Sequence, residues 1–165
     1  MDNDLLSRAR AGDREAFELI VLAKAEPLLR TATAILGNEA DARDATQETF
    51  IAAWRAIGTL RDPERFDAWL GRILINSCRM ALRHRGRTRE VALVDEGTDS
   101  PPASDSTDFE TAFDRLSADQ RALLVLHHLH GYDVREIGRW LGIPSGTVKW
   151  RLSRARRALA AELER

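Results

Sequence analysis

The sequence predicts an all-α protein made of two small helical domains that are joined by a flexible acidic linker. Apolar residues recur three and four positions apart along most of the chain, which is the spacing of a helix face and not the alternation of a strand. Glycines and N-capping residues separate these periodic stretches. Residues 91–107 read VALVDEGTDSPPASDST, with two adjacent prolines and no helical period. We therefore expect domains at 1–90 and 111–165, with a linker over 91–110.

The first domain divides into helices at its glycines and at one proline. A short helix begins near Leu5 and ends near Gly12, and Asp13 can cap the next helix. Pro27 suits the first turn of a third helix, because proline has no N–H group to lose there. Gly37 then ends that third helix.

Two longer helices complete the first domain. One covers about 39–57 and stops at Gly58. After a loop over Thr59–Glu64, the next helix runs to about residue 85. Its inner stripe is predicted from helical spacing to be Phe66, Trp69, Leu70, Ile73, Ser77 and Met80.

The second domain shows clearer helix boundaries. The stretches Ser117–Gln120 and Asp133–Glu136 are capping boxes, in which the first and fourth residues each satisfy the free backbone N–H group of the other. The first of these helices ends at Gly131. Ser145 can cap a last, longer helix that runs through about Leu163.

Residues 134–157, VREIGRWLGIPSGTVKWRLSRARR, predict a helix-turn-helix. Such a motif needs a small residue in its first helix where the second helix crosses closely, and Gly138 supplies it. It also needs a residue that turns easily four positions later, which is Gly142. Apolar anchors follow helical spacing on both helices, namely Ile137 and Leu141, then Val148, Leu152, Ala155 and Leu159.

The polar face of the last helix is basic. Seven basic residues and one acid, Glu136, lie between Arg135 and Arg157. A helix in the major groove needs base-contacting side chains near its N-terminal half and arginines that reach phosphates on either side. The alternative interpretation is a solvated face on an ordinary three-helix bundle. The residues expected to contact DNA are Ser145, Thr147, Lys149, Trp150, Arg151, Ser153, Arg154 and Arg157.

Charge is distributed unevenly, although the formal net charge of the whole chain is only −1. Residues 1–90 carry a net charge of +1, residues 91–112 carry −6, and residues 113–165 carry +4. The local excess of positive charge in the second domain favours a nucleic-acid partner, which the global isoelectric point alone would not.

Several other classes of protein are excluded. No apolar run approaches the roughly 20 residues that span a bilayer, and the acidic N-terminus is unlike a signal peptide, so we expect a cytoplasmic protein. Cys78 is the single cysteine and is expected in the core. His127, His128 and His130 do not share one helix face, so we expect no metal site. Without a catalytic Ser/His/Asp order, a phosphate-binding glycine loop or a carboxylate pair, we expect neither an enzyme, nor a cofactor, nor a small-molecule substrate.

The run EIGRWLGIPSGTVKWRLSRARRAL resembles region 4 of the sigma-70 family of RNA polymerase sigma factors, where a helix-turn-helix reads the −35 promoter element. Because region 4 is also similar to the DNA-binding domain of many response regulators, the first domain decides between them. There, ADARDATQETFIAAWRAI resembles region 2.2, the helix that docks on the clamp helices of the polymerase's largest subunit. The resemblance covers about 5–90 and 110–163. A chain of this length has room for the two domains of the extracytoplasmic-function (ECF) subfamily. The resemblance implies that these are a region 2 helical bundle and a region 4 helix-turn-helix.

The resemblance assigns the polymerase contacts to one polar stripe of the helix over 39–57. Spacings of 3, 3 and 1 place these residues along one side of the helix, while Phe50, Ala53 and Ile57 can face the core. Taken alone, such a stripe is an ordinary solvated face. The expected polymerase-binding residues are Asp41, Asp44, Gln47 and Glu48.

The next segment, RFDAWLGRILINSCRMALRHRGR, resembles regions 2.3 and 2.4, which open and read the −10 element. Six arginines lie between Arg72 and Arg89 without an intervening acid, and such a stripe attracts phosphate. The loop Gly58–Arg65 lies where these factors hold a base flipped out of the −10 strand. By resemblance, the −10 contacts are Thr59, Arg61, Asp62, Arg72, Asn76, Arg79 and Arg83.

Two positions depart from the family's pattern. Trp150 stands where the family usually has a small or polar residue. Its side chain has three alternatives: contact with a thymine methyl group, stacking on backbone sugar, or packing against a neighbouring helix. Met80 stands where we expect an aspartate.

The resemblance implies a sigma factor that binds core RNA polymerase and directs promoter-specific initiation at −35 and −10 elements. Promoter DNA is then the second partner, and an anti-sigma factor is a third that members of this subfamily often have. The alternative function is a helix-turn-helix regulator that binds DNA without docking on polymerase.

Overall fold

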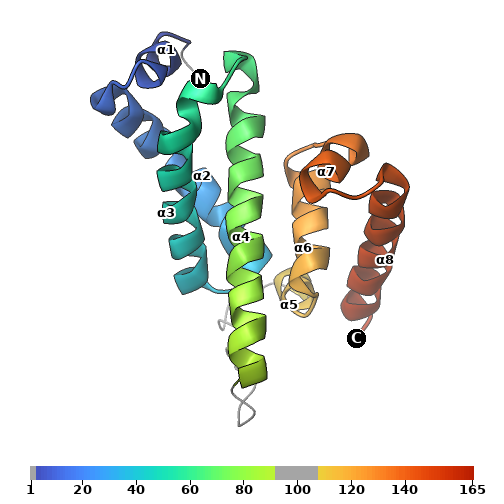
Figure 1. Cartoon of the computed structure of the whole chain (residues 1–165). Helices are drawn as coiled ribbons and strands as arrows, with labels where there is room; N and C mark the ends of the chain where they lie inside the picture. Colours follow the sequence, from blue (N-terminus) through green and yellow to red (C-terminus); the bar gives the residue numbers. More distant parts are fainter. Residues whose placement is uncertain (1–2, 92–107) are drawn as a thin grey trace. The chain divides into compact units, whose positions relative to one another are not determined.

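The structure of the protein is a computed structural model that describes residues 3–91 and 108–165. Every regular element in these two ranges is a helix (Figure 1), so the predicted all-α fold is confirmed. The chain forms two compact units, Met1–His84 and Arg85–Arg165, called here the N-terminal and C-terminal units. Most of the linker predicted over 91–110 lies outside the described residues.

The N-terminal unit is built on long helices. Figure 1 shows α2, α3 and α4 side by side, and an ion pair of 2.6 Å between Lys24 and Asp67 links α2 to α4. The helices enclose a core of fully buried side chains that includes Ile20, Phe66 and Leu74. The elements are α1 (Asn3–Arg10), α2 (Arg14–Leu36), α3 (Glu39–Ala56), the 3-10 turns η1 (Ile57–Thr59) and η2 (Pro63–Arg65), and α4 (Phe66–Val91), which continues past His84 into the C-terminal unit.

Pro27 lies inside α2 and does not begin a new helix, so the predicted break before it is wrong. α2 has buried side chains on both sides of this point, with Ile20 before it and Leu28 and Ile35 after it. Pro27 itself is exposed. A proline on the solvent side costs the helix one backbone hydrogen bond, and the packing of the buried side chains before and after it offsets that cost.

The predicted inner stripe of α4 is partly wrong. Phe66 and Leu70 are buried as expected, but the stripe continues through Leu74 and Cys78, and Met80 is 63% exposed. At 100° per residue, Met80 lies roughly 120° around the helix from Leu74, which turns it out of the core. The other predicted positions, Trp69, Ile73 and Ser77, are half-buried at the margin of the stripe.

The thiol of Cys78 is a core group, as predicted. Its side chain is buried, and desolvation raises its pKa to about 12. The reactive thiolate form is therefore absent near neutral pH.

Apart from the 19-residue α8, the C-terminal unit consists of short helices with well-defined ends. Both predicted capping boxes are present, at Ser117–Gln120 and Asp133–Glu136. Ser145 is the first residue of α8 and not its N-cap, which is Pro144, so that predicted cap is wrong by one position. The elements are α5 (Asp108–Asp114), α6 (Ala118–Leu124), the π-helical turn η3 (Val125–Leu129), α7 (Val134–Leu141) and α8 (Ser145–Leu163).

No helix in the two described ranges is long and apolar enough to cross a membrane.

Candidate nucleic-acid interface

Helices α7 and α8 form the predicted helix-turn-helix. A Cβ atom on Gly138 would lie 2.7 Å from the carbonyl oxygen of Ile143, so only glycine lets the turn approach α7 this closely. Gly142 ends α7 with a φ angle of +68°, in the left-handed region that favours glycine, and its N–H group donates to the carbonyl of Gly138. Both glycines therefore have the roles that the spacing predicts.

The start of α7 is fixed by the side chain of Asp133. This carboxylate accepts hydrogen bonds from the backbone N–H groups of Glu136 and Arg135, at 2.8 and 2.7 Å. These bonds hold the pKa of Asp133 below its usual range, because they stabilise the charged form. The cap therefore stays formed at neutral pH.

Helix α8 separates an apolar face from a basic one. Val148, Leu152 and Ala155 are buried against the rest of the unit. Ser145 and Thr147 are half-buried at the start of the helix. The remaining predicted DNA contacts are all exposed, namely Lys149, Trp150, Arg151, Ser153, Arg154 and Arg157. The exposed side therefore offers both base-contacting and phosphate-contacting groups to a major groove.

Polar contacts position α8 against its neighbours. Arg156 donates to the ring of His128 at 3.1 Å, and the burial of His128 and the charge of Arg156 lower the pKa of this histidine. Near the C-terminal end of α8, Glu162 lies 3.5 Å from Arg115, which follows α5. His127 lies 2.9 Å from the carbonyl oxygen of Tyr132. The histidines thus make contacts within the fold.

The predicted −10 residues of α4 share one side of that helix. Arg72, Asn76 and Arg83 are exposed, and Arg79 is half-buried. Their spacings of 4, 3 and 4 place them opposite the buried stripe through Leu74. The helix can therefore present a continuous polar and basic face to a nucleic-acid strand.

The predicted −10 residues of the loop are also exposed, but two of them have local partners. The hydroxyl group of Thr59 donates to the carbonyl of Ala56 at 2.7 Å. Asp62 caps η2 by accepting from the N–H group of Glu64 at 3.0 Å. Arg61 is exposed at the same loop. Thr59, Arg61 and Asp62 therefore all lie exposed on the short segment between α3 and α4.

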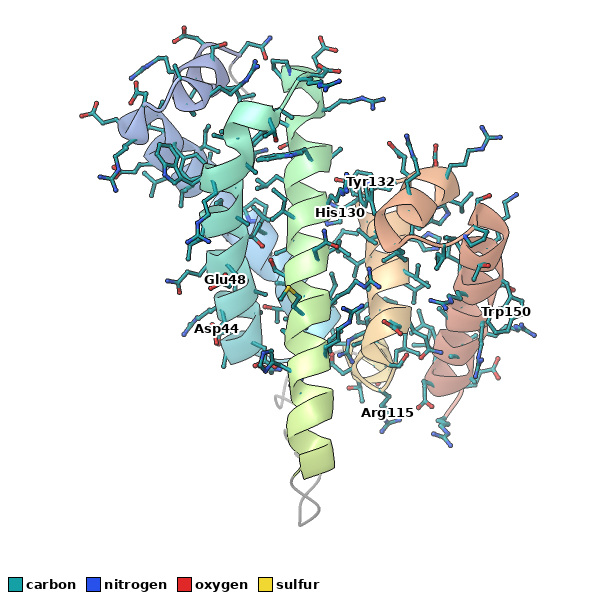
Figure 2. All side chains as sticks on the ribbon, viewed as in Figure 1. Asp44, Glu48, Arg115, His130, Tyr132 and Trp150 are labelled. Carbon is teal, nitrogen blue, oxygen red and sulfur yellow. The ribbon has the colours of Figure 1, made fainter. Side chains whose placement is uncertain are left out.

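The acidic stripe of α3 is only partly free for a partner. Asp44, Gln47 and Glu48 are exposed, and Figure 2 shows Asp44 and Glu48 on the side of α3 that faces away from α4. Neither of these two carboxylates forms an ion pair with a side chain that the structure describes. Asp41 differs, because it is half-buried and accepts a hydrogen bond of 2.9 Å from the N-cap residue Asn38.

Both units match known family models. The Sigma-70 region 2 model matches residues 21–88, and the Sigma-70, region 4 model matches residues 106–159. The chain is 36% identical to the ECF RNA polymerase sigma factor SigM of Mycobacterium tuberculosis over 166 residues, which is 96% of this chain and 83% of SigM. The chain belongs to the ECF sigma factors of the sigma-70 family.

A second relative is longer than this sigma factor. The ECF RNA polymerase sigma factor SigE of Mycolicibacterium smegmatis is also 36% identical, over 90% of this chain, but the chain spans only 63% of that relative.

Two solved structures share the fold of this sigma factor. One is the sigma factor RpoE of Bartonella quintana in complex with the anti-sigma factor NepR, with a TM-score of 0.71 and 29% identity over 90% of this chain and 96% of RpoE. The other is CnrH in complex with the cytosolic domain of CnrY, with a TM-score of 0.66 and 30% identity over 99% of this chain and 97% of CnrH.

The sequence interpretation of this sigma factor missed polar residues that hold the functional helices in place. Thr49 is fully buried, and its hydroxyl group lies 3.3 Å from that of Ser77. Arg121 is buried and donates to the carbonyls of Asp114 and Leu116 at 2.9 and 2.8 Å. Polar residues carry no periodic apolar signal, so only their partners in the fold identify them.

Proposed function

We propose that this ECF sigma factor binds core RNA polymerase and directs promoter-specific transcription initiation. One observation carries the proposal: a single chain combines an exposed, basic helix-turn-helix with a second unit that matches sigma region 2. The function needs no catalytic residue and no cofactor of the sigma factor itself. It also places the protein in the cytoplasm, where polymerase and chromosome meet.

The proposal divides the work among three helices. Residues 1–90 act as region 2, with the exposed acids of α3 on the polymerase clamp helices and the polar face of α4 on the −10 element. Residues 111–165 act as region 4, with α8 in the major groove of the −35 element. Residues 91–110 connect them. The face of α3 that carries Asp44 and Glu48 supports the docking role, because its charges are exposed and without ion-pair partners among the described side chains.

An anti-sigma factor is a further proposed partner. RpoE of Bartonella quintana was solved with the anti-sigma factor NepR, and CnrH with the cytosolic domain of CnrY. This chain shares most of its length with both sigma subunits, which supports a regulatory partner of the same kind.

A regulator that binds DNA without polymerase is the weaker alternative. It would need the helix-turn-helix of α7 and α8 but would give no reason for a region 2 unit over residues 21–88.

In vitro transcription with core polymerase and a promoter library tests the proposal directly. We expect defined start sites that depend on the added chain and on matched −35 and −10 elements. An absence of specific start sites at every salt concentration would contradict the proposal.

Charge reversal on α3 tests the docking surface. Asp44→Lys combined with Glu48→Lys is expected to abolish binding to core polymerase, because two attractive charges become repulsive. Glu15→Lys combined with Glu18→Lys makes the same charge change on exposed positions of α2 and is the matched control. Binding of both double variants to core polymerase would be measured by size-exclusion chromatography. Equal loss in the two variants would refute a specific role for α3.

A further inference from the structure

Trp150 is a large apolar side chain that the fold leaves in solvent. It is 57% exposed, and Figure 2 shows it on the side of α8 that faces away from α6. At 100° per residue, it lies roughly 200° around the helix from Val148, which is fully buried. Packing against a neighbouring helix therefore does not account for this tryptophan. When a partner buries an indole that is exposed in the free protein, apolar surface leaves water, which favours the complex.

On the N-terminal side of Trp150, the same face of α8 carries no side chain, because the residue one turn earlier is Gly146. A Cβ atom on Gly146 would meet no atom within 4 Å. Its backbone is in the ordinary helical region, so the fold itself does not require glycine at this position. The gap leaves room for a base edge to approach the indole from that side.

Arg154 contacts the indole of Trp150 from one turn later on α8. Its guanidinium carbon lies 5.6 Å from the centroid of the Trp150 ring, within the distance at which a cation attracts an aromatic face. The two residues are one turn apart on α8, so this contact restricts the rotamers of both side chains before DNA is bound. A preorganised side chain loses less conformational entropy on binding.

The base chemistry of the major groove then identifies what the ring can recognise. The edges of the bases present hydrogen-bond donors and acceptors, and the C5-methyl group of thymine is the one apolar group among them. We infer that Trp150 is a specificity-determining residue that contacts a thymine methyl group in the −35 element, with Arg154 as its positioning residue. The inference rests on the proposed function of α8 in reading that element.

Replacing thymine by deoxyuridine tests this contact, because it removes the methyl group and keeps base pairing. The −35 sequence would first be selected from a randomised promoter library with the complete holoenzyme. Each thymine in the selected element would then be replaced singly by deoxyuridine, and holoenzyme affinity would be measured. We expect one or two positions at which the wild-type holoenzyme loses about tenfold in affinity, the size of a single mismatch.

Trp150→Ala is expected to remove this sensitivity, so that thymine and deoxyuridine promoters bind the variant equally. Leu163→Ala is the matched control, because it truncates another exposed apolar side chain of α8, near its C-terminal end. This control should keep the wild-type response. An unchanged deoxyuridine effect in Trp150→Ala would overturn the inference, as would a selected −35 element without any methyl-sensitive thymine.

Arg154→Lys separates positioning from charge. Lysine keeps the positive charge for phosphate but loses the planar group that lies over the indole. We expect the salt dependence of binding to be unchanged and the deoxyuridine effect to fall several-fold. If the deoxyuridine effect keeps its full size, Arg154 has no positioning role.

Failure of this inference is distinguishable from failure of the proposed function. If the chain does not direct specific initiation at all, the proposed function fails and no −35 element is selected. If initiation is specific but methyl sensitivity does not depend on Trp150, only the further inference fails.

Discussion

The two units fix their functional helices by different means. In the C-terminal unit, α7 begins at the cap residue Asp133 and ends at Gly142, and the turn to α8 is set by a close approach at Gly138. All three residues lie within ten positions of one another. In the N-terminal unit, α4 is held by contacts between residues far apart in sequence, such as the pair Thr49 and Ser77. Local chemistry thus sets the ends of α7 and the turn to α8, whereas a contact between distant residues links α4 to α3.

This difference teaches where each unit is sensitive to substitution. Truncation of a buried side chain should damage the N-terminal unit most, because its long helices depend on a shared core. A change in backbone freedom or local space should damage the C-terminal unit most, because the short helices α6 and α7 depend on their ends.

The largest expected effect is that of Leu74→Ala. This side chain of α4 is almost completely buried, so its truncation should lower the free energy of unfolding of the N-terminal unit by about 2–5 kcal/mol. Leu22→Ala removes an equal volume at a position that is 76% exposed and should change stability little. Hydrogen exchange of the amides within residues 3–84 would measure both variants. Similar losses in the two variants would mean that burial does not govern stability here.

The next effect is a gain. Pro27→Ala should raise the free energy of unfolding of the N-terminal unit by about 3 kcal/mol, the difference between proline and alanine inside a helix. Because Pro27 is exposed, its ring contributes no core contact that alanine would lose. Urea titration of the same amides measures the change. A destabilised variant would show that the proline ring has a packing role that its exposure conceals.

Pro27 also shows how far the sequence allowed prediction in the N-terminal unit. The all-α class and most helices follow from periodicity, but the break at Pro27 is predicted from a local rule, and packing on both sides of the proline overrides it. Met80 is predicted in the core for a similar reason, since it continues the spacing through Ile73 and Ser77, whereas the buried stripe of α4 turns away from them through Leu74 and Cys78. In both cases the contacts of the whole helix decided the outcome.

The C-terminal unit was more predictable, because its determining residues act on their neighbours in sequence. Gly138, Gly142 and both capping boxes were identified from spacing alone. The exposed basic face of α8 is predicted as the side opposite its apolar residues Val148, Leu152 and Ala155. The partner of Trp150 could not be predicted, because the geometry of Arg154 over the ring depends on side-chain conformation.

Gly138→Ala tests this local control in the C-terminal unit. A Cβ atom there would lie 2.7 Å from a backbone oxygen, so the turn must shift, and we expect a loss of about 1–3 kcal/mol in that unit. Gly146→Ala is the matched control, because its Cβ atom meets nothing and alanine is favoured over glycine in a helix. Hydrogen exchange within residues 108–165 would measure both. Tolerance of Gly138→Ala would show that the close approach of the turn to α7 is not required.

The smallest effect concerns a contact between two hydroxyl groups, one on α3 and one on α4. Thr49 donates to the carbonyl of Ala45 at 2.6 Å and lies 3.3 Å from the hydroxyl of Ser77. Thr49→Val keeps the shape but removes this group, and we expect a loss of about 1 kcal/mol in the N-terminal unit. Thr46→Val is the control, because Thr46 makes the same bond within α3, to the carbonyl of Ala42 at 2.7 Å. A larger loss for Thr49→Val than for Thr46→Val, measured by hydrogen exchange of α3 and α4, would assign the difference to the contact with Ser77. Equal losses would mean that apolar packing alone sets the register of the two helices.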